Sequence, residues 1–329
     1  MSDGKDERIL VIGAGMTGLT IARTLADAGA EIVVAEKSRG IGGRMASRRT
    51  DFGTFDHGAQ YVTGKGGPFR ALLTGLSHDG TVKFWKPTGK DRTLEWHVGV
   101  PAMNKMLQPM VGGYDLRFQT RVTTVKRDGD GLSVGMETKN EGSTETVERF
   151  DRVLSTIPGP QAHDLLSDLG EPFERLNEVG YEPCWTLMLA FADRLGTEHE
   201  IYRSEPGDGS AIGWATRNSS KPDREGDHDL WIVNGEGGWS REHLEKEPGA
   251  IVPELLSAFR ELLDVDVPEP AHAAAHRWRY AAVERPLGNP MLLSDDGRLG
   301  AAGDWCIAPR VEAAFESGRA LADAIKQRL

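Results

Sequence analysis

The feature that most constrains this chain is a glycine-rich turn near its N-terminus. The segment Gly13-Ala14-Gly15-Met16-Thr17-Gly18 follows an uninterrupted apolar run, Arg8 to Ile12, and residues 17–28 after it carry apolar side chains at helical spacing. An unbroken apolar run of this length is typical of a strand buried on both faces of a parallel sheet. A strand, a tight glycine turn and a helix in this order predict that the N–H groups at the helix start face an anion such as a pyrophosphate.

The next acidic residue supports a dinucleotide site. A second predicted strand, Ile32 to Ala35, ends at Glu36, which lies 18 residues beyond Gly18. A carboxylate there is placed to accept hydrogen bonds from an adenosine ribose and disfavours a 2′-phosphate. The pattern therefore indicates NAD or FAD in preference to NADP, and it does not choose between those two. A plain glycine-rich turn is the weaker alternative, because the predicted strand before the glycines, the predicted helix after them and the acidic residue at the expected distance all match a dinucleotide site.

Length and composition exclude other classes of protein. The chain has 329 residues, more than the roughly 250–300 at which one hydrophobic core stops growing, so we expect two domains. It carries 39 Lys+Arg against 50 Asp+Glu, a formal charge of −11, without a basic cluster, which argues against nucleic acid as a partner. Its two cysteines exclude a disulfide framework and a four-cysteine zinc site, and we expect no metal. No apolar run is long enough for a membrane span or a signal peptide, so we expect no membrane partner and a cytoplasmic protein.

Patterns further along the chain predict the remaining elements. Residues 116–153 alternate in strand fashion around turns at 128–131 and 140–142. The other predicted strands are 153–157, 185–191, 211–215, 230–234 and 299–302, and the other predicted helices are 101–110, 250–263 and 311–326.

A second glycine cluster directly follows Glu36. Residues 37–44 read Lys-Ser-Arg-Gly-Ile-Gly-Gly-Arg and combine three basic side chains with glycines. Such a segment suits a second close approach of the backbone to a pyrophosphate, although a basic surface turn has the same composition.

Three stretches resemble the FAD-dependent amine oxidase superfamily. Glu36 followed by Gly42-Gly43-Arg44 is similar to its double-glycine signature, and residues 56–61 resemble its segment beside the isoalloxazine. Residues 302–304 with 311–314 resemble its closing motif. Within the superfamily the chain is most similar to the renalase family, especially its bacterial members. The stretches that carry this likeness span residues 9 to about 322 and include 37–40, 42–45, 58–61, 99–103, 220–222, 239–240, 276–280, 303–306 and 310–312.

The resemblance implies an α/β fold with two domains. One is a Rossmann-type FAD-binding domain of the p-hydroxybenzoate-hydroxylase and amine-oxidase type, and the other is a smaller α+β substrate domain. The expected FAD-binding segments are 1–66, 98–160 and 289–329, and the expected substrate-domain segments are 67–97 and 161–288.

The resemblance also implies an activity. Renalase-like proteins hold FAD non-covalently and oxidise the 2- and 6-dihydro isomers of NAD(P)H to NAD(P)⁺ by hydride transfer to flavin N5, with O2 reduced to H2O2. Such a transfer requires no strong general base, which agrees with a sequence that offers no obvious catalytic dyad. Two alternatives stay open: an amine oxidase acting on a small amine, and an FAD-binding redox sensor without turnover. Two departures count against the amine oxidase, since residues 158–172 contain no lysine and Arg310 stands where that class often has a tyrosine.

The resemblance assigns the site residues. The implied cofactor-binding residues are Gly13, Ala14, Gly15, Met16, Thr17, Gly18, Glu36, Lys37, Ser38, Arg39, Gly42, Gly43, Arg44, Met45, Ala59, Gln60, Val122, Thr156, Gly303, Asp304, Arg310, Val311 and Ala314. The implied substrate-site residues are Gln60, Trp278, Arg279, Tyr280, Trp305 and Arg310. The aromatic residues among them suit the walls of a site for a planar ring, although they are also ordinary core residues. His57 is interpreted first as a turn residue and second as a site residue, and Cys306 as a buried thiol.

Overall fold

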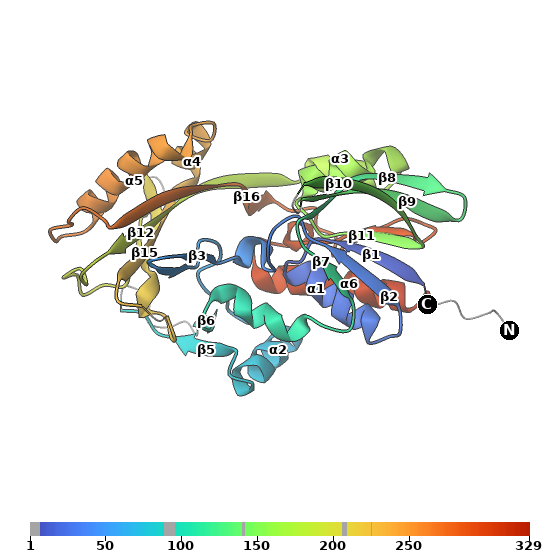
Figure 1. Cartoon of the computed structure of the whole chain (residues 1–329), viewed down its shortest axis with the longest axis horizontal. Coiled ribbons are helices and arrows are strands. Elements are labelled where there is room, and N and C mark those ends of the chain that lie inside the picture. Colours follow the sequence, from blue (N-terminus) through green and yellow to red (C-terminus); the bar gives the residue numbers. More distant parts are fainter. Residues whose placement is uncertain (1–6, 89–95, 140–141, 206–208, 225) are drawn as a thin grey trace. The chain divides into compact units, whose positions relative to one another are not determined.

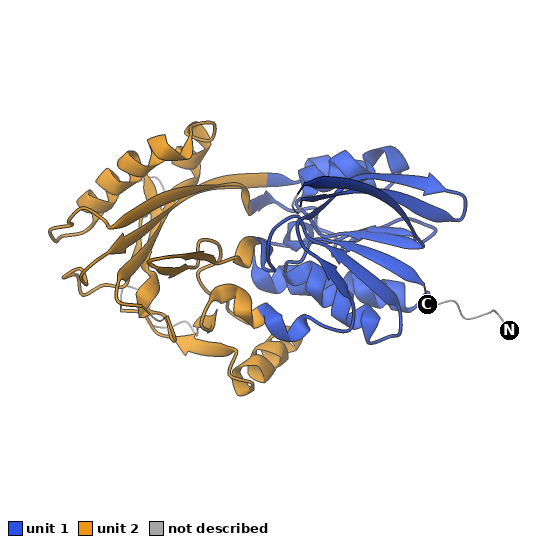
Figure 2. Cartoon of the chain, viewed as in Figure 1, with its two compact units in different colours: residues 1–43, 107–180, 283–329 blue, residues 44–106, 181–282 orange. Residues whose placement is uncertain are grey.

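The computed structural model describes residues 7–88, 96–139, 142–205, 209–224 and 226–329. The chain forms two compact units, coloured separately in Figure 2: unit 1 comprises Met1–Gly43, Leu107–Gly180 and Val283–Leu329, and unit 2 comprises Arg44–Met106 and Tyr181–Ala282. These limits differ from the expected domain limits at residues 44–66, 98–106, 161–180 and 283–288. The second unit, expected to be the smaller, is as long as the first.

The core of unit 1 is a six-stranded sheet. Its order is β17 (Leu292–Leu293), β18 (Leu299–Ala301), β11 (Arg152–Ser155), β1 (Arg8–Ile12), β2 (Glu31–Ala35) and β7 (Asp115–Arg117). All neighbours pair in parallel except β17 and β18. Leu10 and Val11 in the central strand are fully buried, as expected for a strand that is covered on both faces. The prediction of a parallel sheet built around residues 8–12 is confirmed.

Two layers cover this sheet, as Figure 1 shows. Helices α1 (Met16–Ala26) and α6 (Val311–Lys326) lie on one face, and the antiparallel strands β8 (Thr120–Asp128), β9 (Gly131–Lys139) and β10 (Ser143–Phe150) lie on the other. The two helices pack closely at Gly318, where a Cβ would lie 2.8 Å from the Thr17 carbonyl oxygen. The hydroxyl of Thr17 also donates to the Ala314 carbonyl at 2.9 Å. The rest of unit 1 includes α3 (Gly159–Leu166) and the short 3₁₀ turns Ser167–Leu169, Phe173–Glu178 and Asp304–Cys306.

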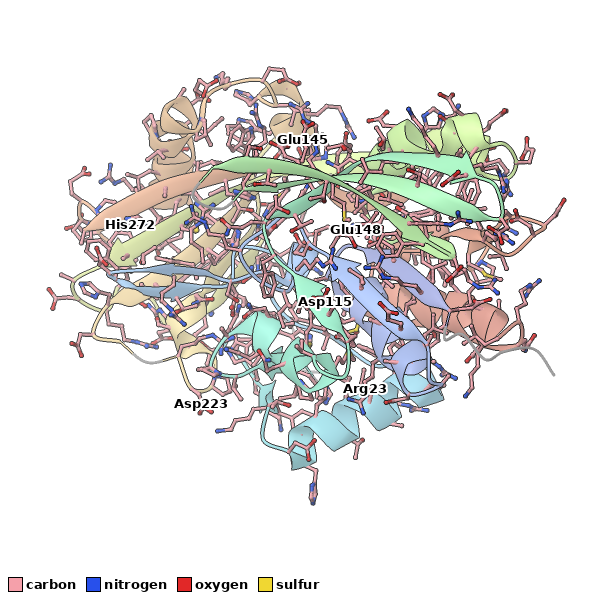
Figure 3. All side chains as sticks on the ribbon, turned by 45° about the vertical axis from the view of Figure 1, so that its right-hand side comes forward. Arg23, Asp115, Glu145, Glu148, Asp223 and His272 are labelled. Atoms are coloured by element: carbon pink, nitrogen blue, oxygen red, sulfur yellow. The ribbon has the colours of Figure 1, made fainter. Side chains whose placement is uncertain are left out.

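Charged side chains join the parallel sheet to β10. Glu148 on β10 accepts from Arg8 at 2.7 Å and from Arg117 at 2.5 Å, and Arg117 also pairs with Asp115. Glu148 and Asp115 are labelled in Figure 3. All four side chains are partly exposed, and exposed ion pairs contribute only about 0–1 kcal/mol each. The buried apolar faces therefore hold these layers together.

Unit 2 is built on a five-stranded sheet. Its order is β13 (Ile201–Arg203), β14 (Ile212–Arg217), β15 (Asp229–Gly235), β12 (Gly180–Phe191) and β16 (His272–Arg285). Helix α5 (Pro248–Leu262), beside the short α4 (Gly237–Glu242), covers one face through a core that includes Trp185, Trp231 and Phe259. The hairpin β3 (Arg48–Thr50) and β4 (Gly53–Phe55) lies against part of the other face through Phe55. Unit 2 also contains α2 (Gly67–His78) and the hairpin β5 (Val82–Trp85) and β6 (Trp96–Gly99).

Most predicted elements are confirmed to within a few residues, and several short elements, among them α3, α4 and β13, were not predicted. Residues 101–110 form a 3₁₀ helix, Met103–Met110, in which Pro109 lacks the N–H that a regular α-helix uses. Helix α2 and strand β16 were not predicted, since glycines and a proline lower the helical signal of α2 and nearly all of β16 is partly exposed. The predicted turn at 140–142 falls mainly on residues outside the described part of the chain. In that described part, no helix is long and apolar enough to cross a membrane.

The close approach at Gly18 gives a direct test of the fold. A Cβ on Gly18 would lie 1.9 Å from the Gly13 carbonyl oxygen, so Gly18→Ala must displace backbone. We expect this variant to lose about 1–3 kcal/mol of unfolding free energy and to retain little FAD. Urea unfolding and the flavin absorbance of the purified protein measure both effects. Gly75→Ala in α2 is the matched control: no atom lies within 4 Å of its new Cβ, and it should stabilise by about 0.5–1 kcal/mol. Equal effects of the two substitutions would contradict this account.

Candidate functional site

The first glycine turn in unit 1 is braced from the neighbouring strand. Gly13 has φ +106°, a left-handed conformation that favours glycine, and its N–H donates to the Ala35 carbonyl at 2.9 Å. The hydroxyl of Thr156, just after β11, donates to the Ile12 carbonyl at 2.8 Å. The same hydroxyl oxygen would lie 2.9 Å from a Cβ on Gly13 or on Gly18. Thr156 therefore fixes the turn that leads into α1.

The start of α1 presents backbone N–H donors. Gly15 is the N-cap, and no described side chain caps the N–H groups that follow, those of Met16, Thr17 and Gly18. A Cβ on Gly15 would make only ordinary contacts, 3.8 Å from the Gly42 oxygen and 3.9 Å from Gly43. Uncapped N–H groups at the positive end of a helix dipole are the usual donor set for a pyrophosphate.

The structure brings the two glycine clusters together. The N–H of Gly42 donates to the Ala14 carbonyl at 3.0 Å, and both Gly42 and Gly43 have positive φ angles. Between the clusters, the buried carboxylate of Glu36 accepts from the N–H groups of Ala14 and Ser38, each at 2.8 Å. Each oxygen of a carboxylate has a second lone pair, so Glu36 keeps the capacity to accept from ribose hydroxyls.

The other predicted cofactor residues of unit 1 differ in exposure. Lys37, Ser38 and Arg39 lie in an exposed segment after β2, and Val122 is buried in β8. At the C-terminal end, Asp304 is buried, Arg310 is exposed as the N-cap of α6, and Val311 and Ala314 are partly exposed in the first turns of that helix. The side chain of Arg310 makes no capping hydrogen bond at this helix start.

Two residues near Asp304 serve packing. A Cβ on Gly303 would lie 2.2 Å from the Trp305 indole nitrogen, so glycine is needed there to make room for the indole. Trp305 is fully buried and donates to the Ile157 carbonyl at 3.2 Å, a position inside the core of unit 1. Burial raises the pKa of the Cys306 thiol to about 12, which keeps that thiol protonated and unreactive.

Several of the predicted site residues of unit 2 lie in or against the turn at residues 56–60. The N–H of Ala59 donates to the Arg44 carbonyl at 2.8 Å, and a Cβ on Gly58 would lie 2.1 Å from that same oxygen. Met45, beside Arg44, is buried. Gln60 donates through Nε2 to the carbonyls of Asp56 at 2.6 Å and Gly58 at 2.8 Å.

A fully buried carboxylate organises this turn. One oxygen of Asp56 accepts from the Met103 N–H at 2.9 Å and from the Ser47 hydroxyl at 2.7 Å. The other accepts from Lys221 Nζ at 3.1 Å and from the Arg224 guanidinium at 2.6 Å. The side chains of Asp56 and Lys221 are 0% exposed and that of Arg224 is 2% exposed.

Lys221 uses all three of its ammonium hydrogens inside this cluster. Besides Asp56 it donates to Gln60 Oε1 at 3.0 Å and to Asn218 Oδ1 at 3.3 Å. Burial lowers the pKa of Lys221 to about 8, partly offset by Asp56. Burial alone would raise the pKa of Asp56, but Lys221 and Arg224 hold it well below its usual range. We call Asp56, Gln60, Lys221 and Arg224 the Asp56 cluster.

Sequence reasoning missed three of these four residues as a site. Asp56 lies in residues 56–61, which resemble the segment beside the isoalloxazine in the amine oxidase superfamily, and Lys221 and Met103 lie in the renalase-like stretches 220–222 and 99–103, but none of the three was assigned a role. The structure shows what these three stretches share: Met103 and Lys221 both donate hydrogen bonds to the Asp56 carboxylate. A lysine and an aspartate distant in sequence carry no signal of their pairing unless the tertiary structure is known.

An aromatic group lies on the other side of the same turn. The indole N–H of Trp278 donates to the His57 carbonyl at 2.8 Å, which fixes the ring. The ring centroid of His57 lies 5.2 Å from that of Trp278, and the centroid of His276 lies 4.5 Å from it. Arg48 donates to His276 Nδ1 at 3.2 Å. Burial, together with the neighbouring His276 and Arg48, lowers the pKa of His57 to about 4. Burial and Arg48 lower the pKa of His276 to about 4 as well. Both rings are therefore neutral at pH 7.

Strand alternation in β16 divides the remaining predicted residues. Trp278 and Tyr280 share one face, and Tyr280 lies edge-on to Tyr181 with centroids 5.3 Å apart. Arg279 points to the opposite face, where it is exposed and pairs with both oxygens of Glu245 at 2.7 and 3.0 Å. The structure therefore brings Gln60 and Trp278 together on one turn and does not bring Arg279 to them.

Comparisons with known proteins identify the family of this chain and its fold. The model of a family described as flavin containing amine oxidoreductase matches residues 99–326, and that of an NAD(P)-binding Rossmann-like domain matches residues 11–76. A curated 4,4'-diapophytoene desaturase of Staphylococcus aureus (strain Newman) is 46% identical over 55 residues, 17% of this chain and 11% of the desaturase. The chain thus matches about a tenth of that relative's length.

Two solved structures show the same fold over nearly the whole chain. A putative protoporphyrinogen oxidase from Exiguobacterium sp. 255-15 has a TM-score of 0.72 at 13% identity and covers 99% of this chain and 100% of its own. Cyclohexylamine oxidase from Brevibacterium oxydans IH-35A has a TM-score of 0.72 at 13% identity, with 98% and 99% covered.

Removing the anion from the Asp56 cluster should lower the unfolding free energy more than removing one cation does. Asp56→Asn leaves two buried cations without a counter-ion, and breaking a buried pair in this way costs about 3–5 kcal/mol of unfolding free energy. Lys221→Met leaves the neutral pair of Asp56 and Arg224, so we expect a clearly smaller loss. Urea unfolding of both variants measures the difference. A larger loss in Lys221→Met would contradict the description of Asp56 as the organising charge.

The two histidines should make stability depend on pH. Their pKa values in the folded protein, about 4, lie below the ordinary value of 6.5, so the unfolded chain binds more protons between these limits. The melting temperature should therefore fall as the pH is lowered from 6.5 towards 4. In the variant His57→Asn with His276→Gln, the slope between pH 6.5 and 5, above the range of most carboxylates, should be smaller. An unchanged slope would show that these rings do not titrate as described.

Proposed function

This chain belongs to the flavin-containing amine oxidoreductase family, and we propose that within it the protein is a renalase-like oxidase. It is an FAD-dependent oxidoreductase with a Rossmann-type domain. In the proposed reaction a 2- or 6-dihydro isomer of NAD(P)H, one proton and O2 give NAD(P)⁺ and H2O2. The substrate loses a hydride and its ring becomes aromatic, and O2 takes up both electrons in the end.

FAD, when bound, supplies the two-electron acceptor for this reaction, and flavin N5 is the proposed position of hydride transfer. The residues of unit 1 fit such a group. The uncapped start of α1 and the glycine pair at 42–43 would hold its pyrophosphate, and Glu36 would accept from its ribose. The buried, protonated Cys306 gives no support for a covalent link, so we propose non-covalent binding.

The fixed indole of Trp278 is the observation that carries the choice of substrate. Its hydrogen bond to the His57 carbonyl and the neutral rings of His57 and His276 around it make a rigid, uncharged, planar surface. A planar ring packs favourably on such a surface, and orientation is the main contribution that a protein makes to a hydride transfer. Gln60, through its bonds to the carbonyls of Asp56 and Gly58, keeps the turn beneath Trp278 in place.

The hydride step of this reaction requires no general base from the protein, because oxidising a dihydropyridine releases no proton in that step. The titratable groups around the turn agree with that requirement. His57 and His276 are neutral at pH 7, and every ammonium hydrogen of Lys221 is already bonded. In this proposal Arg310, exposed at the start of α6, provides a cation suited to an anionic dinucleotide.

Oxidation of a small amine is the second candidate, favoured by the family as a whole and by the fold shared with cyclohexylamine oxidase. Against it stand the lack of a lysine in residues 158–172 and the cations Arg48, Lys221 and Arg224 around the turn, which disfavour a protonated amine.

Anaerobic reduction separates the two candidates. We expect the yellow, oxidised protein to lose its visible flavin absorbance rapidly when mixed with 2- or 6-dihydro-NAD, and to stay yellow with ordinary NADH or with a panel of small amines. Admitting air should restore the colour and yield one H2O2 per turnover. Bleaching by an amine alone would favour the second candidate, and bleaching by none of these compounds would reject both.

A further inference from the structure

A polar row crosses the sheet of unit 2 on the face opposite α5. Thr186 on β12 pairs in register with Asn234 on β15, and Asn234 pairs in register with Trp214 on β14. Directly paired residues share one face of a sheet, with Cβ atoms about 4.5–5.5 Å apart. The next row, Met188, Ile232 and Thr216, leads into the apolar cluster that Phe55 closes. The row of Thr186, Asn234 and Trp214 is thus the first polar row beyond that cluster.

Neighbours on β12 fix the orientation of the Asn234 side chain. Its Nδ2 donates to Thr186 Oγ1 at 2.8 Å and to Cys184 Sγ at 3.6 Å, so both amide hydrogens have partners. Burial raises the pKa of Cys184 to about 11, so this sulfur remains a neutral thiol. Among the described residues, no donor reaches Asn234 Oδ1, which leaves one oriented carbonyl oxygen on this face.

Trp214, the register partner of Asn234 on β14, belongs to a group of aromatic rings. The Trp214 centroid lies 5.8 Å from that of Trp96 and 6.0 Å from that of Tyr61, and the rings of Tyr61 and Trp96 are stacked at 3.9 Å. One cation lies over this group: the Arg203 guanidinium is 5.1 Å from the Trp214 centroid. A carbonyl acceptor paired in register with an aromatic ring that a guanidinium covers suits a neutral amide on a planar ring and disfavours an ammonium group.

We propose that Asn234, oriented by Thr186 and Cys184, accepts a hydrogen bond from the primary carboxamide of a dihydropyridine substrate. This inference rests on the proposed function and adds to it a residue that determines specificity. A site built to bond an N–H rejects an analogue without that group more strongly than a shape-based site does, because the acceptor is left unpaired once the bound ring covers it.

Paired substrates test this assignment. The 6-dihydro isomer of NAD carries a carboxamide, and the same isomer of 3-acetylpyridine adenine dinucleotide carries a methyl ketone that cannot donate. Asn234→Leu keeps the size of the side chain and removes the acceptor. It should lower the apparent affinity for the carboxamide substrate about tenfold in anaerobic flavin reduction. The affinity for the acetyl analogue should change less than about twofold, and Asn289→Leu, an exposed site in unit 1, should alter neither. Equal losses for both substrates in Asn234→Leu would overturn the proposal.

A second measurement keeps the test independent of turnover and of folding. Quenching of tryptophan fluorescence gives the affinity of the wild-type protein for NAD⁺ and for the oxidised acetylpyridine analogue. We expect the carboxamide to bind more tightly, and this preference to shrink in Thr186→Val, which frees the Asn234 amide to rotate. Equal affinities in the wild-type protein would overturn the proposal. A clear preference without any flavin reduction would support the role of Asn234 as an amide site and reject the proposed oxidase activity.

Discussion

Burial of one carboxylate between two cations is the constraint on which the candidate site of unit 2 depends. Asp56 joins two segments distant in sequence, one at Met103 and one at Lys221 and Arg224. Every hydrogen of the Lys221 ammonium is bonded within this cluster. Desolvated charges are costly unless geometry and hydrogen bonds compensate fully, so the turn at 56–60 has one well-defined conformation. The conformation of this turn fixes the positions of Gln60 and of the His57 carbonyl, which accepts the hydrogen bond from Trp278.

Unit 1 follows from the sequence because its constraints are local. The glycine turn, the apolar strand before it and Glu36 all lie within the first 36 residues, and each acts through backbone geometry that a spacing pattern reveals. The close approach of Gly18 to the Gly13 carbonyl and the bonds of Glu36 to Ala14 and Ser38 are what such a pattern implies. A contact between distant segments was harder to predict: Gly318 brings α6 against α1.

The site of unit 2 could be predicted only in part because its residues are joined by tertiary contacts. Trp278 and Gln60 were predicted through family resemblance, and the structure places Gln60 in the turn at 56–60 and bonds the Trp278 indole to that turn. Arg279 was predicted with them, yet the two-residue period of β16 turns it to the opposite face, where it pairs with Glu245. Asn234 was not predicted at all, since an asparagine in an apolar strand gains meaning only when Thr186 and Trp214 are known to lie beside it.

The central claim is that this family member takes a hydride from a dihydropyridine ring that unit 2 orients. Single-turnover flavin reduction by 6-dihydro-NAD, carrying deuterium in place of the transferred hydrogen, tests it most directly. The account predicts a clear primary isotope effect on the rate of flavin bleaching, without a matching effect when the deuterium is at a ring position that does not react. A reduction rate that is insensitive to deuterium at the reacting carbon, or the absence of reduction, would contradict it.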